Sequence, residues 1–127
     1  MIKNLFGLTL ALLVLSGCSS LPSDNPSELV GYKQSGKASF YAMKYQSRTT
    51  ANGERFDQGK LTAAHRELPF GTKVKVTNPE NGKSVVVRIN DRGPFIRGRI
   101  IDLSRTGFSA IGNLNDGVIP VTIEVVN

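Results

Sequence analysis

The sequence is poor in the residues from which disulfides and metal sites are built. It contains one cysteine and one histidine among 127 residues. A single cysteine excludes an internal disulfide, so the folded part must be held together by packing alone. One histidine and scattered acidic residues lack the spacing of a metal site, and we expect neither a metal nor another cofactor. A glycine-rich phosphate loop and a meaningful Ser-His-Asp order are also missing.

Long apolar runs are almost absent too, and the one that exists is too short to span a membrane. Leu5–Leu15 follows the positive charge of Lys3 and would rise about 16 Å as a helix, roughly half of a bilayer core. This pattern is typical of the apolar region of a secretory signal peptide. Leu15-Ser16-Gly17-Cys18 resembles the bacterial lipobox. We therefore expect residues 1–17 to be a lipoprotein signal peptide and Cys18 to be lipidated.

The expected lipid predicts where the protein is located. Each buried CH₂ contributes about 0.8 kcal/mol, so three acyl chains on Cys18 would anchor the chain firmly to a membrane. Ser19 stands where an aspartate would signal inner-membrane retention. By analogy with lipoprotein sorting, we expect the bacterial cell envelope, at the periplasmic face of the outer membrane. Residues 18–35 are rich in Ser and Pro without an apolar period, which predicts a lipidated flexible tether.

Residues 36–127 are enough for one small domain. Several short segments alternate apolar and polar residues or are rich in β-formers, and Asn81-Gly82 between two of them indicates a hairpin. The predicted strands are Lys37–Tyr41, Val74–Val76, Val85–Ile89, Arg99–Leu103 and Val121–Val126. A short helix is expected over Ser104–Ile111, with Asp102 or Ser104 as its N-cap and Gly112 at its end. These elements predict a compact, mainly β barrel.

Three segments rich in turn residues, 50–54, 61–65 and 90–94, carry candidate chemical groups. They contain Glu54, His65 and Asp91. Breaking a glycosidic bond requires a proton donor and a proton acceptor beside the sugar, and paired carboxylates are the usual supply. The segments therefore indicate an active site for a sugar polymer.

Each candidate also has a purely structural explanation. Asp91 could form an Asx-turn or pair with Arg92. Glu54 could be a solvated loop residue, and His65 follows an apolar run and could be a core or rim histidine. Asp102 is expected to cap the helix or to join an ion pair rather than to react. The residues alone leave these alternatives open.

Six segments resemble the rare lipoprotein A (RlpA) family in order and spacing. They are Ala38–Tyr41, Thr50–Glu54, Leu61–Arg66, Leu68–Thr72, Asn90–Phe95 and Arg99–Ser104. The resemblance covers nearly all of residues 36–127. It implies a small six-stranded double-psi β-barrel with one short helix, the barrel also used by expansins, barwin and family-45 endoglucanases.

The resemblance further implies an enzyme, an endolytic lytic transglycosylase. Such an enzyme cleaves the β-1,4 bond between N-acetylmuramic acid and N-acetylglucosamine in peptide-stripped peptidoglycan and leaves 1,6-anhydro ends. Glu54, His65 and Asp91 fall on the family's catalytic positions. The alternative is a non-catalytic, expansin-like module that binds glycan or loosens the wall, favoured by Phe40 in place of tryptophan and by the altered loop 42–47. An inverting hydrolase is a third possibility.

The positive charge of the chain suits such a glycan. The net charge is +6, and an exported protein is not expected to meet nucleic acid. Without peptides, each muramic lactyl group is a free carboxylate that arginines can bind. We expect Arg88, Arg92 and Arg99, near Arg97, to bind these carboxylates, and Tyr41, Tyr45 and Phe95 to stack on sugars, whereas Phe40 is expected in the core. Nothing in the sequence indicates a protein partner.

Overall fold

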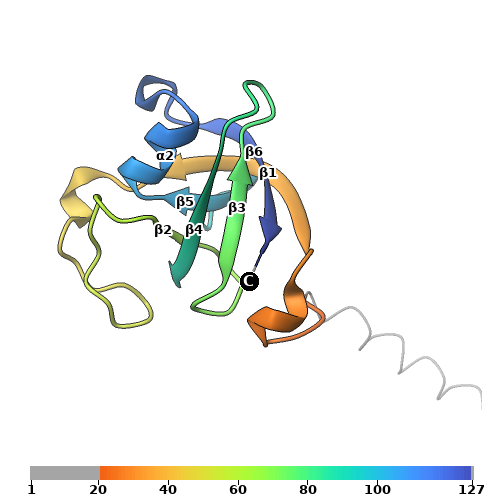
Figure 1. Cartoon of the computed structure of the whole chain (residues 1–127). Coiled ribbons are helices and arrows are strands. Elements are labelled where there is room, and N and C mark those ends of the chain that lie inside the picture. The colour runs from red at the N-terminus through yellow and green to blue at the C-terminus, as the bar shows by residue number, and fades with distance from the viewer. Residues whose placement is uncertain (1–20, 127) are drawn as a thin grey trace, which may run out of the picture.

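A computed structural model describes residues 21–126, and its centre is a closed barrel of six strands (Figure 1). The order around the barrel is β1-β5-β2-β4-β3-β6. The pairs β1–β5 and β2–β4 are parallel, and the other four pairs are antiparallel. This mixed barrel with one short α-helix confirms the predicted fold class. The strands are β1 (Lys33–Phe40), β2 (Thr62–Ala64), β3 (Lys73–Thr77), β4 (Ser84–Asp91), β5 (Arg99–Leu103) and β6 (Ile119–Val125).

The alternation of β3 and β4 shows why the barrel closes. Val74 and Val76 are buried on β3, while Lys73 and Lys75, which alternate with them, are exposed. Val76 pairs with Val85 across the hairpin, as the Asn81-Gly82 signal predicted. Burial of one face of each strand supplies the apolar contacts that hold the sheet closed.

The α-helix α2 (Arg105–Ile111) packs against β1, β4 and β5. Ser104 is its N-cap, because the Ser104 hydroxyl accepts a hydrogen bond from the Gly107 N–H at 3.1 Å. The helix ends as expected, with the Gly112 N–H on the Phe108 carbonyl. Three short 3₁₀ helices complete the helical elements of residues 21–126: η2 (Pro26–Leu29), η3 (Met43–Tyr45) and η4 (Leu114–Asp116).

The folded part begins before the predicted boundary at Gly36. Leu29 is 1% exposed in the core, and the Gly31 N–H donates to the Val125 carbonyl at 2.8 Å. Lys33 already pairs with Glu124 of β6. The first residues of β1 are polar and mostly exposed, so the sequence shows no apolar period there. Backbone pairing with β6 forms this part of the strand. The predicted signal peptide 1–17 and Cys18 lie outside the described residues.

Strand β2 was not predicted as a strand. Its three residues are all buried, so the alternation that reveals a half-buried strand is missing. It pairs with β4 on one side and with β5 on the other. Within residues 21–126, no helix is both long and apolar enough to cross a bilayer.

Gly36 tests the packing of β1 over β5. A Cβ added at Gly36 would lie 2.6 Å from the Cγ2 of Ile100, which is itself buried. We expect Gly36→Ala to lower the free energy of unfolding by about 1–3 kcal/mol, as overpacking does elsewhere. Denaturant unfolding followed by circular dichroism would measure it. Gly59→Ala is the matched control, because its nearest new contact is at 3.4 Å, and equal stability of the two variants would contradict the account.

Candidate active site

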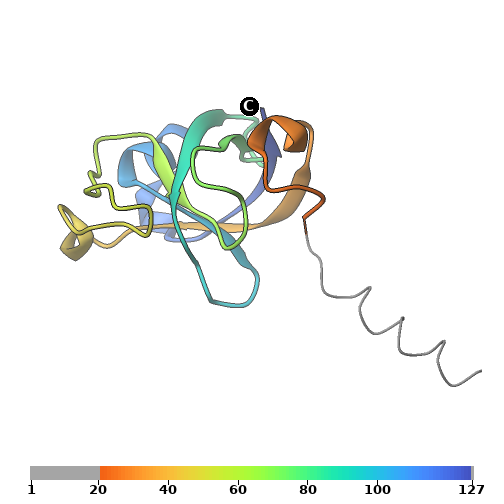
Figure 2. The ribbon, with the colours of Figure 1, turned by 90° about the horizontal axis from the view of Figure 1, so that it is seen from below.

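Two aspartates line one cleft of about 520 Å³ at the end of β4. The register of β2 brings them there, because Ala64 pairs with Asp91 of β4 on one side and with Asp102 of β5 on the other. The two backbones are thus two strand spacings apart, about 10 Å. The loop that joins β4 to β5 extends away from the barrel (Figure 2). Its residues 92–96 supply one wall of the cleft.

Asp91 is held rigidly by donors on both of its carboxylate oxygens. The Ala51 N–H donates to Oδ1 at 2.8 Å, and the Arg92 N–H donates to the same oxygen at 2.9 Å. The Tyr41 hydroxyl donates to Oδ2 at 2.5 Å. Burial, and then the hydrogen bond to Asp91, raise the pKa of Tyr41, so this phenol remains a hydrogen-bond donor at neutral pH. The Asp91 carboxylate therefore has one fixed orientation in the cleft.

Asp102 occupies a different environment in the same cleft. Burial raises the pKa of the Asp102 carboxyl, and the negative charge of Asp91 acts in the same direction. A hydrogen bond from the Ser39 hydroxyl and the charge of Arg99 oppose this rise. Asp102 therefore retains a proton to higher pH than an exposed aspartate does.

The expectation that Asp102 caps the helix or joins an ion pair is wrong. Ser104 is the cap, and the ion pair found among residues 21–126 joins Arg88 to Glu54. Asp102 was missed as a candidate because the helix that follows it offered a simpler role. Its polar side chain within the apolar strand Arg99–Leu103 was the available signal.

Glu54 lines a separate pocket of about 320 Å³ and is not among the residues of the aspartate cleft. Arg88 Nη1 and Nη2 donate to its two carboxylate oxygens at 2.9 and 3.1 Å, and Asn90 Nδ2 adds a bond at 3.0 Å. These hydrogen bonds lower the pKa of Glu54 and keep it ionised. Arg88 and Asn90 alternate along β4 with Asp91, which explains why the two acids face different pockets.

His65 is buried at 2% exposure and its ring is absent from the lining of the cleft. Its Nδ1 accepts the backbone N–H groups of Glu67 and Leu68 at 3.0 and 3.1 Å. Nε2 therefore carries the proton and donates to Gln34 Oε1 at 2.8 Å. Burial lowers the pKa of His65 to about 4, so the ring is neutral at pH 7. The His65 N–H also donates to the Asp91 carbonyl at 3.1 Å.

The predicted substrate-binding arginines divide into two groups. Arg99 and Arg92 line the cleft of the two aspartates, whereas Arg88 belongs to the Glu54 pocket. Arg92 is also engaged by the protein, because its Nη1 donates to the carbonyls of His65 and Leu68. Arg99 is thus the less constrained cation of the cleft.

The aromatic residues that line the cleft differ in how far they are exposed to solvent. Tyr41 is partly buried and stacks on Phe56 with a centroid distance of 4.2 Å, while Tyr45 lies edge-on to Tyr41 at the rim. Phe95 is 77% exposed on the wall formed by the β4–β5 loop. Phe40 packs against the core edge-on to Phe108 at 4.8 Å, but it is only partly buried and also lines the cleft, so its expected core role is met in part.

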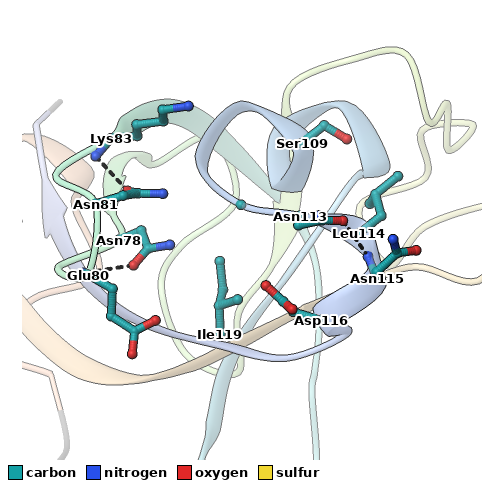
Figure 3. A pocket seen from close by; sticks show the side chains of 11 residues that line it. Asn78, Glu80, Asn81, Lys83, Ser109, Asn113, Leu114, Asn115, Asp116 and Ile119 are labelled. Carbon is teal, nitrogen blue, oxygen red and sulfur yellow. Dashed lines mark hydrogen bonds between the residues drawn. The ribbon is translucent and has the colours of Figure 1, made fainter.

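A larger hollow of about 710 Å³ lies at the β3–β4 turn and the end of α2 (Figure 3). Its three asparagines Asn78, Asn81 and Asn113 already serve the fold. The side-chain amides of Asn78 and Asn81 donate to the Ile111 carbonyl, and Asn113 Oδ1 accepts the Asn115 N–H. This hollow therefore does not compete with the aspartate cleft as a candidate site. Across residues 21–126, His, Cys, Asp and Glu nowhere gather in the groups of three that a metal ion needs.

Comparison with known proteins identifies close relatives. The family described as lytic transglycolase matches residues 33–123. The "Probable endolytic peptidoglycan transglycosylase RlpA" of Synechocystis is 62% identical over 91 residues, which are 72% of this chain and 28% of that protein. The "Endolytic peptidoglycan transglycosylase RlpA" of Vibrio cholerae is 53% identical over 96 residues, 76% of this chain and 36% of that one. The chain thus spans about a third of the length of these relatives.

A solved structure shares the barrel. The D78N mutant of Clavibacter michiganensis expansin, in complex with cellohexaose, superposes with a TM-score of 0.59 at 25% identity. The alignment covers 75% of this chain and 50% of the expansin.

The buried histidine predicts a pH dependence of stability. Folding lowers the pKa of His65 from 6.5 to about 4, so the unfolded state binds its proton first as the pH falls. Stability is therefore full above pH 6.5 and decreases as the pH falls toward 4, by about 3 kcal/mol from this group. In the His65→Asn variant, the amide oxygen can accept a hydrogen bond near the position of Nδ1, but the side chain has no group that titrates between pH 4 and pH 7. Denaturant unfolding between pH 7 and pH 4 should show a shallower loss in this variant, and identical slopes would refute the prediction.

Proposed function

Because this chain belongs to the lytic transglycolase family, as its resemblance to RlpA proteins indicated, we propose that its barrel cleaves the glycan strands of peptidoglycan. The observation that carries the proposal is the pair of aspartates on either side of Ala64, which line one cleft in different electrostatic environments. A glycosidic bond needs a proton donor and a proton acceptor at the same time, and this pair supplies both.

The proposed substrate is glycan stripped of its peptides, cut within the strand at the β-1,4 bond from N-acetylmuramic acid to N-acetylglucosamine. Two features support this substrate. Arg99 in the cleft matches the free lactyl carboxylate of a stripped muramic acid. Phe95 and Tyr45 at the exposed wall and rim match the apolar faces of sugar rings.

In the proposed reaction Asp102 is the proton donor. Burial raises the pKa of Asp102, which favours this carboxyl as the one that donates a proton to the glycosidic oxygen. As the C1–O4 bond breaks, the departing N-acetylglucosamine oxygen takes this proton and positive charge develops on the muramic ring. The nearby Asp91 carboxylate stabilises that charge.

Asp91 then completes the reaction as the base. The C6 hydroxyl of the muramic acid attacks its own C1, and Asp91 accepts the hydroxyl proton, so a C1–O6 bond replaces the C1–O4 bond. No water enters the product, which ends in a 1,6-anhydro ring. Because nucleophile and electrophile belong to one sugar, orientation rather than nucleophile strength determines the rate. Solvent returns both carboxyls to their starting protonation states.

His65 serves the cleft indirectly in this scheme. Its backbone N–H holds the Asp91 carbonyl, and its carbonyl helps to fix Arg92. A neutral, buried imidazole with both nitrogens bonded has no free position for substrate. We therefore assign His65 a supporting rather than a chemical role.

The same barrel also suits a second function, binding without cleavage. The expansin neighbour is described as a complex with cellohexaose, so this fold can hold a glycan chain in that protein. In this chain the exposed Tyr45 and Phe95 would then bind sugar while the aspartates only position it.

We further propose the bacterial cell envelope as the location. Residues 1–17 would be the signal peptide and Cys18 the lipid-bearing residue, with anchoring at the periplasmic face of the outer membrane. The part of the predicted tether 18–35 that precedes the fold would then be short, because Leu21 already packs against the core and Leu29 is buried in it. The predicted partners are the glycan and the membrane.

The activity is tested by mass spectrometry of products from peptide-stripped peptidoglycan. We expect anhydro-muramic ends from the wild-type protein and a loss of at least about 10²-fold in Asp91→Asn and Asp102→Asn, because each removes one partner of the proton transfers. Asp116→Asn, an acid at the far hollow, is the matched control and should react normally. Reducing ends would mean hydrolysis. Intact glycan that still binds would mean a binding module.

A further inference from the structure

The turn that contains Glu54 touches the reacting carboxylate through its backbone. Within the turn, the Gly53 N–H donates to the Thr50 carbonyl at 3.0 Å and the Thr50 N–H donates to the Glu54 carbonyl at 2.7 Å. Gly53 has φ 94°, a conformation that favours glycine. The closed turn presents the Ala51 N–H to Asp91 Oδ1 at 2.8 Å. Whatever fixes this turn therefore also fixes a donor to Asp91.

Three side chains fix the 50–54 turn to β4. Arg88 and Asn90 project from β4 and donate three hydrogen bonds to the Glu54 carboxylate, at 2.9, 3.1 and 3.0 Å. We refer to Glu54, Arg88 and Asn90 as the Glu54 clamp. The Asn90 amide oxygen is buried and has no hydrogen-bond partner among the described residues, so Glu54 is the anchor of this amide. The Asn52 N–H adds a backbone bond to the Asn90 carbonyl at 3.3 Å.

We propose that Glu54 is a positioning residue, which with Arg88 and Asn90 clamps the 50–54 turn to β4 so that the Ala51 N–H orients Asp91. The inference rests on the proposed function for the role of Asp91, while the clamp itself does not. It assigns Arg88 to the same task and removes it from the substrate-binding set. Glu54 acts on the reaction from a neighbouring pocket through one backbone donor.

The clamp is not the only support of the Asp91 carboxylate. Arg92 N–H and Tyr41 OH hold Asp91 independently of the turn, so loss of the clamp would loosen the carboxylate without releasing it. A misplacement on the order of 1 Å in a catalytic group costs about 10²-fold in rate. Removing either side of the Glu54–Arg88 pair should therefore produce a similar loss, and removing both should add little.

The test compares Glu54→Gln, Arg88→Ala and the double variant, with Arg55→Ala as the matched control. Arg55 lines the same pocket but is not part of the clamp. Two quantities are measured: kcat for release of anhydro ends, and hydrogen exchange of the Ala51 amide by NMR. The His65 amide, which directly follows β2 and donates to the Asp91 carbonyl, is the internal reference for exchange.

We expect each single variant and the double variant to lose about 10²-fold in kcat with little change in KM. Ala51 exchange should accelerate at least about 10-fold in all three, since the turn opens locally, while His65 exchange stays constant. Arg55→Ala should match the wild type in both quantities. If Glu54→Gln does not fold, Arg88→Ala alone carries the comparison.

The opposite pattern would overturn the inference. Inactivity of Glu54→Gln beside a fully active Arg88→Ala, with Ala51 protected in both, would mean that Glu54 meets the substrate itself. A wild-type protein without lytic products, whose Ala51 exchange still responds to both substitutions, would instead retain the clamp and overturn the proposed function.

Discussion

The pairing of the short strand β2 with two partners determines the rest of the site. Ala64 is in register with Asp91 on the parallel strand β4 and with Asp102 on the antiparallel strand β5. A shift of β2 by one residue would turn its own side chains to the opposite face and break both pairings of Ala64, so the strand that sets the two aspartates side by side would be lost. The burial of all three β2 residues opposes such a shift, since exposing them would cost apolar contacts.

The acids of this barrel differ because their surroundings differ. Burial raises the pKa of Asp102, whereas hydrogen bonds from Arg88 and Asn90 lower the pKa of Glu54. The Asp91 carboxylate accepts three hydrogen bonds on its two oxygens. In the proposed reaction the acid with the raised pKa donates the proton, the carboxylate of fixed orientation accepts one, and the third acid orients the second.

Much of the barrel could be predicted from sequence, because β3, β4 and β6 alternate apolar and polar residues and Ser104 is a good N-cap. The strand β2 and the start of β1 could not, since one has no exposed position and the other is ordered by backbone pairing. For the site, the three segments rich in turn residues already indicated Asp91, Glu54 and His65, and the resemblance placed all three on the family's catalytic positions. The separation of Glu54 from Asp91 into two pockets, and the burial of the His65 ring, depend on contacts between distant segments.

In the proposed reaction, the two aspartates replace the glycosidic bond with a bond from C1 to the C6 hydroxyl oxygen of the same muramic acid, without water. Cleavage of peptide-stripped glycan in ¹⁸O-labelled water, followed by mass spectrometry of the new muramic ends, measures this directly. We expect unlabelled ends that are lighter than hydrolysed ends by one water. Ends that carry ¹⁸O would contradict it, because water rather than the C6 hydroxyl would then have attacked C1.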